Sequence, residues 1–185
     1  DRAALSLQQF SHFGEIKWSG LVSDWSVNTG LQYQWIDNAN LAGTGVLPLI
    51  PNYLSYNPGA FIVFQKSKNN WKYELGSRFD FKAYDVKAIS NSLPREIEEF
   101  KNRFFNYAFS AGLSNEISEK LRLSINAGST MRAPHVNELY AMGLHQGVSG
   151  IEEGDASLKQ ETGYKVLGNL DWRSNNKLFV QALIY

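Results

Sequence analysis

Hydrophobic and polar residues alternate along much of the chain. In residues 120–132 one set of alternate positions is apolar and the other is polar or charged: Leu121, Leu123, Ile125, Ala127 and Met131, against Lys120, Arg122, Ser124, Asn126 and Arg132. Successive side chains of a strand point to opposite faces, so this pattern predicts a strand with one apolar and one polar face. The same period recurs, clearly or more weakly, in seven other segments: residues 25–35, 71–83, 103–114 and 161–173, and then 8–18, 59–66 and 177–185. We therefore predict an all-β fold of about eight strands.

The segment 71–83 indicates which face of the predicted sheet should point outward. Its apolar set is Trp71, Tyr73, Leu75, Phe79 and Phe81, and its polar set is Lys72, Glu74, Gly76, Arg78, Asp80 and Lys82. The clear strands have roughly 11 to 13 residues, which at a tilt of about 45° project about 25–30 Å along a membrane normal. We expect the apolar set to point outward and the polar set to point inward.

The predicted connections alternate between short and long. The short ones are residues 19–24, 67–70, 115–119 and 174–176, and the long ones are residues 36–58, 84–102 and 133–160. In an antiparallel up-and-down meander every second connection lies at the same end of the sheet, so all the short turns should share one end. Short turns at one end and long loops at the other are typical of transmembrane β-barrels of the outer membrane.

The tryptophans favour the same interpretation. Four of the five, Trp18, Trp25, Trp71 and Trp172, stand near the short-turn ends of their predicted strands. An indole ring has an apolar body and one hydrogen-bond donor, which suits the interface between lipid and water. The alternative is a soluble antiparallel sheet with one face on a core, for example a binding or adhesion module, because such a sheet also alternates.

Composition excludes several other classes. The chain has 185 residues, 43% of them hydrophobic, with no net formal charge and no cysteine. It therefore lacks the basic excess of a nucleic-acid partner and has neither disulfides nor thiolate metal sites. No apolar run approaches the about 20 residues of a membrane helix, and residues 1–20 do not read as a signal peptide. We find no catalytic constellation and expect the protein not to be an enzyme.

Residues 128–172 contain a series of short motifs: Arg132-Ala133-Pro134, Glu138-Leu139-Tyr140, Gly143-Leu144-His145, Glu153-Gly154-Asp155, Leu158, Glu161 and the strand that ends at Trp172. In this order they resemble the late barrel segment of TonB-dependent outer-membrane receptors. Residues 43–61, which lead into residues 71–80, are similar to this family as well.

The resemblance implies active uptake of iron complexes, either siderophores or haem, across the bacterial outer membrane. Receptors of this family are 22-stranded barrels closed by an N-terminal plug and energised through a TonB box. We expect residues 1–185 to be a partial barrel domain without plug or TonB box. The implied partners are outer-membrane lipid, the TonB complex through the N-terminal region, and a small-molecule or metal-complex ligand. No cofactor is required, although iron complex, haem or zinc is a possible cargo.

The loop after residue 132 carries the candidate ligand residues. Pro134 fits the first position of a helix and Gly143 the residue past its end, so residues 134–142 should form a short helix. The residues expected to face an arriving ligand are Arg132, His135, Asn137, Glu138, Tyr140 and His145. The alternative is that Arg132, Glu138 and Glu161 form a charge network that braces the loop.

A metal site is the second possibility in this loop. Imidazole and carboxylate groups bind zinc and iron, and the candidates are His145, Glu152, Glu153 and Asp155. Some haem receptors of the family carry a ligating histidine before an Asn-Pro box, but here Asp155-Ala156-Ser157-Leu158 stands in that place. Some zinc receptors carry a segment similar to Gly143–His145 with an acidic stretch behind it, so zinc uptake stays open as an alternative.

Overall fold

The computed structural model describes residues 6–42, 47–90, 93–145, 150–174 and 178–185. In these residues it contains strands and one short helix: β1 (Leu7–Val22), β2 (Trp25–Asn40), β3 (Asn52–Lys68), β4 (Trp71–Ile89), β5 (Ile97–Ser118), β6 (Leu121–Arg132), α1 (Val136–Tyr140), β7 (Met142–His145), β8 (Gly150–Glu153), β9 (Glu161–Ser174) and β10 (Leu178–Ile184). No helix among these residues is long and apolar enough to cross a membrane.

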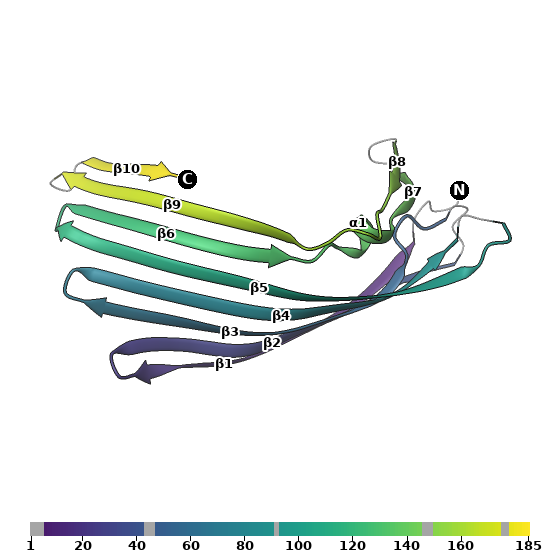
Figure 1. Ribbon diagram of the computed structural model, residues 1–185, viewed down its shortest axis with the longest axis horizontal. Coiled ribbons are helices and arrows are strands. Elements are labelled where there is room, and N and C mark those ends of the chain that lie inside the picture. The colour runs from purple at the N-terminus through teal and green to yellow at the C-terminus, as the bar shows by residue number, and fades with distance from the viewer. Residues whose placement is uncertain (1–5, 43–46, 91–92, 146–149, 175–177) are drawn as a thin grey trace.

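Eight strands form one antiparallel sheet in the order β1-β2-β3-β4-β5-β6-β9-β10, and β7 and β8 form a separate hairpin. The turns at residues 23–24, 69–70 and 119–120 lie at one end of the sheet, as do the adjoining ends of β9 and β10, where Ser174 pairs with Leu178 (Figure 1). Ser23 and Asn69 adopt a φ of 54° in the two-residue turns. The predicted meander and its shared short-turn end are confirmed, and most of the predicted turn at 174–176 lies outside the described residues.

Two of the three long loops expected from the sequence are mostly strand. β2 and β3 fill most of residues 36–58, and β4 and β5 fill most of residues 84–102. The predictions for these segments are wrong because the strands stay paired beyond the point where the regular apolar alternation stops. The third segment, residues 133–160, is a long connection that contains α1 and the β7–β8 hairpin.

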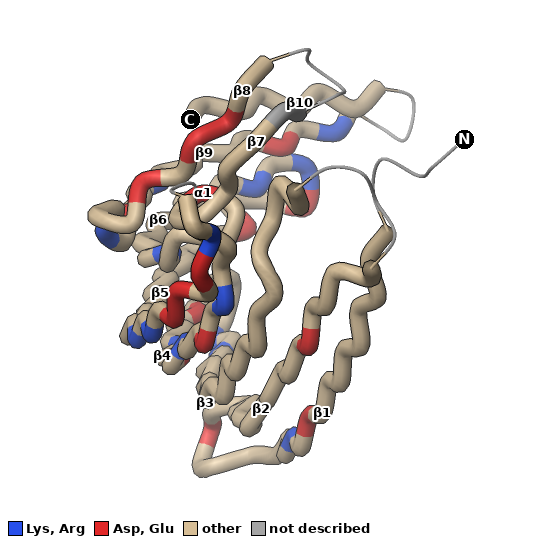
Figure 2. Tube along the Cα trace, turned by 90° about the vertical axis from the view of Figure 1, so that its right-hand side faces the viewer, with Lys and Arg blue, Asp and Glu red and all other residues tan. Residues whose placement is uncertain are grey.

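The sheet has an apolar face and a polar face, as the alternation predicts. On the apolar face Phe79 stacks on Phe105 and meets Phe109 edge-on. On the polar face Arg78 forms an ion pair with Asp80. A hollow of about 620 Å³ on this face is lined by polar residues of the five strands from β2 to β6, including Gln65, Lys72, Glu74, Ser114 and Asn126. Figure 2 shows the strands following an arc from β1 to β10, with α1 inside it. Because α1 packs on Tyr84 and Val86, which share one face of β4 with Lys72 and Glu74, the polar face is the concave one.

The polarity of the two faces of β4 and β5 reverses at Lys82 and Phe104, which lie opposite each other. Beyond them the convex face is polar and the concave face carries apolar residues. On the convex face Phe81 opposes Phe105, and the pairs that follow toward the long-loop end are Ala83–Arg103, Asp85–Lys101 and Lys87–Glu99. These positions form ion pairs, Arg103 with Asp85 at 2.8 Å and Lys87 with Glu99 at 3.3 Å. The apolar band of β4 thus runs from Trp71 to Phe81, which corresponds to about 25 Å along the normal of a tilted barrel.

Candidate functional site

Helix α1 lies on the concave face, next to the part of β4 where the polarity of the two faces reverses. Its Val136 and Leu139 are 0% and 1% exposed and belong to one buried cluster with Tyr53, Tyr84 and Val86. Five partly buried residues surround this cluster: Ile36, Ile50, Phe100, Phe104 and Tyr140. The change of character along β4 therefore provides the apolar surface on which the loop helix packs, and α1 and β7 lie inside the arc of strands (Figure 2).

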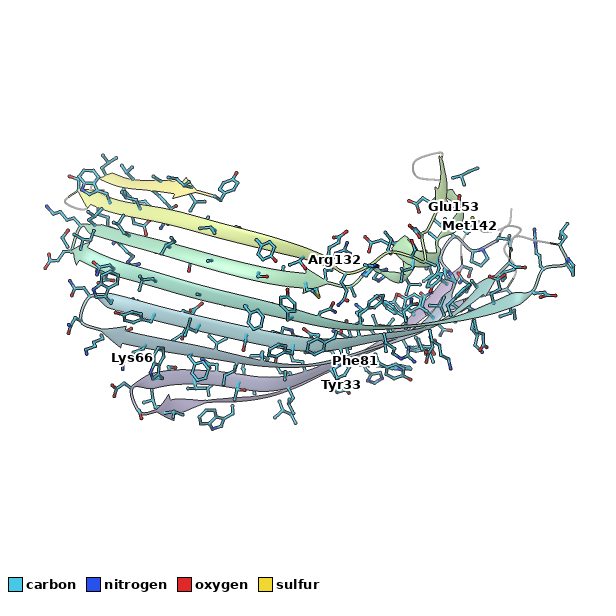
Figure 3. All side chains as sticks on the ribbon, in the orientation of Figure 1. Tyr33, Lys66, Phe81, Arg132, Met142 and Glu153 are labelled. Carbon is cyan, nitrogen blue, oxygen red and sulfur yellow. The ribbon has the colours of Figure 1, made fainter. Side chains whose placement is uncertain are left out.

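Arg132, at the end of β6, links α1 to the wall of the partial barrel, which is the eight-stranded sheet (Figure 3). Its guanidinium donates two hydrogen bonds to the Glu138 carboxylate, at 2.8 and 3.0 Å, and a third to Glu161 at 3.0 Å. Glu138 also accepts a hydrogen bond from the backbone N–H of His135 at 2.6 Å, which satisfies a donor at the helix N-terminus. The structure thus contains the bracing network that the sequence offered as the alternative role of these residues.

The ends of the helix differ from the prediction. His135 is the N-cap, so Pro134 precedes the helix rather than occupying its first position. Ala141 is the C-cap in an extended conformation, and Gly143 belongs to β7, with a φ of 146°. The predicted helix over residues 134–142 is therefore too long at both ends, because the charged contacts of Glu138 define its start and the β7–β8 hairpin follows directly.

The Arg132–Glu138 pair should make the docking of this loop depend on pH. The hydrogen bonds from Arg132, followed by that from the His135 N–H, hold the pKa of Glu138 at about 2. A free glutamate titrates near pH 4.3, so the stabilisation is complete above that value and is lost as the pH falls from there toward 2.

We therefore expect a spin label at residue 151, which is 80% exposed as Ile151, to become more mobile over that pH range. In an Arg132→Gln variant the label should be mobile already at pH 6, and its mobility should change little on acidification. A transition centred well above pH 4.3 in the unmodified loop would contradict the assignment.

The other candidates on α1 have different surroundings. His135 and Asn137 are exposed, and the His135 Nδ1 lies 2.5 Å from the Asn137 Oδ1. The His135 ring meets the rings of Tyr53 and Tyr84 edge-on. Tyr140 instead stacks on Phe100 with its ring centroid at 4.7 Å and donates its hydroxyl hydrogen to Asn102. His135 and Asn137 are thus exposed, whereas Tyr140 holds α1 to β5.

The chain returning from the hairpin also fastens the helix. The backbone N–H groups of Gly154 and Asp155 donate to the carbonyls of Ala141 and Glu138 at 2.7 and 2.9 Å. A Cβ at Gly154 would lie 2.5 Å from the backbone nitrogen of Tyr140. Only glycine allows this close approach, a requirement that the sequence does not reveal because the contact joins distant turns of one loop.

The metal candidates are not brought together among the described side chains. The Asp155 carboxylate accepts hydrogen bonds from the hydroxyl and the backbone N–H of Ser157, which lower its pKa. Glu152 and Glu153 belong to β8, and within the described part of the chain no three histidine, aspartate or glutamate side chains form a metal-binding group. The side chain of His145 lies outside the described residues, so its role in a metal site stays a prediction.

Below α1 the concave face carries a polar network that no local pattern in the sequence identifies as a unit. Arg78 binds Asp80 through two hydrogen bonds and also donates to Gln32, which donates to Glu15. An added side chain at Gly59 would collide with this network. The polar positions of three strands pointed to such contacts, but their partners follow only from the register of the strands.

Comparisons with known proteins agree with this architecture. The family model described as "TonB dependent receptor-like, beta-barrel" matches residues 9–182. A search of curated proteins finds no match. Among solved structures the chain is similar to the copper transporter OprC, with a TM-score of 0.71 and 12% sequence identity, a level that shows the fold alone.

That similarity covers 91% of this chain and 28% of the transporter chain, so the chain spans less than a third of the transporter's length. The family model, in contrast, extends over nearly all of the chain and accounts for its meander and its two-faced strands. The chain therefore belongs to the TonB-dependent receptor-like β-barrel family, and it is a protein of the bacterial outer membrane.

Proposed function

We propose that the chain forms part of the wall and mouth of an outer-membrane receptor that imports an iron complex, either a siderophore complex or haem, with energy supplied through TonB. The observation that carries the proposal is the placement of α1. The helix stands at the mouth over a charged concave wall, and His135 and Asn137 are exposed there. A ligand that enters from outside would meet these side chains before it reaches the Arg78–Asp80 network.

A barrel wall with a lipid-facing convex side and a polar concave side is suited to conduct a polar solute across the membrane. The β4 strand shows this division in detail, with aromatic rings on the convex side and an Arg78–Asp80 ion pair on the concave side. The name of the similar copper transporter does not decide the cargo, because the similarity concerns the fold.

The test is an uptake assay with the intact receptor in cells that lack other routes for the metal. We expect accumulation of radioactive iron supplied as a siderophore complex or as haem, and we expect a protonophore or loss of TonB to abolish it. Uptake of labelled zinc or copper in place of iron would overturn the iron assignment. Iron uptake that persists without TonB would overturn the energised mechanism.

A further inference from the structure

The ammonium group of Lys82 lies on the concave face below α1. Its side chain is half-buried, and its Nζ stands 5.4 Å from the ring centroid of Tyr84. Within the part of the chain that the structure describes, no carboxylate forms an ion pair with Lys82. A half-buried cation next to an aromatic ring keeps part of its hydrogen-bonding capacity for another partner, because a ring face accepts no strong hydrogen bond.

The neighbouring Tyr84 carries a second candidate donor, its hydroxyl group. This residue is 1% exposed, and its hydroxyl is buried without a hydrogen-bond partner among the described residues. Leaving a buried hydroxyl unpaired costs about 1–3 kcal/mol, so such groups call for a specific explanation. Lys82 and Tyr84 are two positions apart on the same face of β4, which places both unused donors on one patch of the wall.

The acidic groups around this patch are already engaged. Asp80, whose charge acts on Lys82, binds Arg78 through two hydrogen bonds. Glu138 and Glu161 both bind Arg132, whose charge acts on Lys82 as well. The patch therefore offers an ammonium group and a hydroxyl group as donors, while the nearby carboxylates are held by the two arginines.

We propose that Lys82 and Tyr84 bind a negatively charged oxygen of the cargo, which makes the cargo an anionic metal chelate rather than a bare metal cation. This inference rests on the proposed function and adds the charge class of the ligand. A free cation would be repelled by Lys82 and Arg132 and would find the adjacent carboxylates occupied. The oxygen of an anionic chelate would instead pair with the ammonium and satisfy the Tyr84 hydroxyl.

Access to the hydroxyl requires α1 to move, because the buried cluster with Val136 and Leu139 covers Tyr84. This movement is feasible for a helix of five residues, which has too few internal hydrogen bonds to be stable alone. Its link to the wall through Arg132 and Glu138 is also exposed, with the two side chains 51% and 36% accessible. The patch thus becomes available when the loop lifts.

The experiment compares the intact receptor with Lys82→Gln and Tyr84→Phe variants, using equilibrium binding of three ferric complexes. The complexes are ferric citrate, which is anionic, the neutral ferrichrome and the cationic ferric complex of desferrioxamine B. Lys87→Gln is the matched control, because Lys87 lies on the same strand but on the convex face, paired with Glu99.

We expect the intact receptor to bind the anionic complex most tightly. Lys82→Gln should weaken that binding about tenfold or more, the effect of losing a hydrogen bond to a charged group, and Tyr84→Phe should weaken it less. Lys87→Gln should leave it unchanged. Preference for the neutral or cationic complex, or an equal effect of Lys82→Gln on all three, would overturn the inference and leave the transport function standing. If the receptor binds none of the three complexes, the inference falls, and the uptake assay with siderophore complexes and haem decides the proposed function separately.

Discussion

Replacing Leu75 by arginine in the intact receptor should destabilise the barrel by about 2–4 kcal/mol, the cost of a cationic side chain near the middle of the bilayer. Leu75 is on the convex face of β4, opposite Ala111 and Phe64 on the neighbouring strands. It lies inside the apolar band that begins at Trp71 and ends at Phe81. Equilibrium unfolding by guanidinium in lipid vesicles measures this free energy directly.

Ser114→Arg is the matched control, since Ser114 lines the polar hollow on the concave face of β5. The same new side chain should there cost less than about 1 kcal/mol, because it stays in a polar environment. If the two variants lose the same stability, the assignment of the convex face to lipid is wrong. A one-residue slip of register would produce the opposite ranking, because it exchanges the two faces.

Truncating Leu139 to alanine should release α1 from the concave wall. Leu139 is 1% exposed in the cluster with Tyr84 and Val86, and truncation of a fully buried leucine costs about 2–5 kcal/mol. A loss of that size is large for a helix of five residues, which is too short to be stable on its own. We expect the protection of the Leu139 and Ala141 amides, which bond to His135 and Asn137, to fall by at least tenfold in hydrogen exchange.

Ile151→Ala is the control in the same loop, because Ile151 is 80% exposed in β8. It should leave the protection of the α1 amides unchanged. Equal loss of protection in both variants would show that the loop is not held through the apolar cluster. The free energy of global unfolding of the barrel should be similar in both variants, since the β4–β5 pairing does not depend on the helix.

The sheet could be predicted from the sequence because its signal is local. Alternation over residues 71–83 and 120–132, together with polar turns, is sufficient to assign strands, their order and their faces. The continuation of the strands into residues 36–58 and 84–102 could not be predicted in this way. At Tyr84 and Val86 the apolar residues move to the other face of β4, since they pack under α1 rather than against lipid, and this change interrupts the pattern.

The candidate site was predicted less completely, because its contacts join distant parts of the chain. The link between Arg132 and Glu138 was anticipated, as the two residues are close in sequence and opposite in charge. The stacking of Tyr140 on Phe100 and the unpaired hydroxyl of Tyr84 depend on how the loop folds back onto β4 and β5. No local pattern specifies that path, so these features required the structure.

We conclude that β4 crosses the membrane with its convex face toward lipid up to Phe81 and toward water beyond it. The most direct test is a spin-label scan of residues 71–89 in the intact receptor in lipid, which is simplified by the absence of cysteine from this chain. We predict that odd positions from 71 to 81 are accessible to oxygen and even positions to a water-soluble nickel chelate. From position 83 onward the odd positions should become accessible to the nickel chelate. A scan without a two-residue period, or with odd positions from 83 onward still in contact with lipid, would contradict this assignment of the two faces.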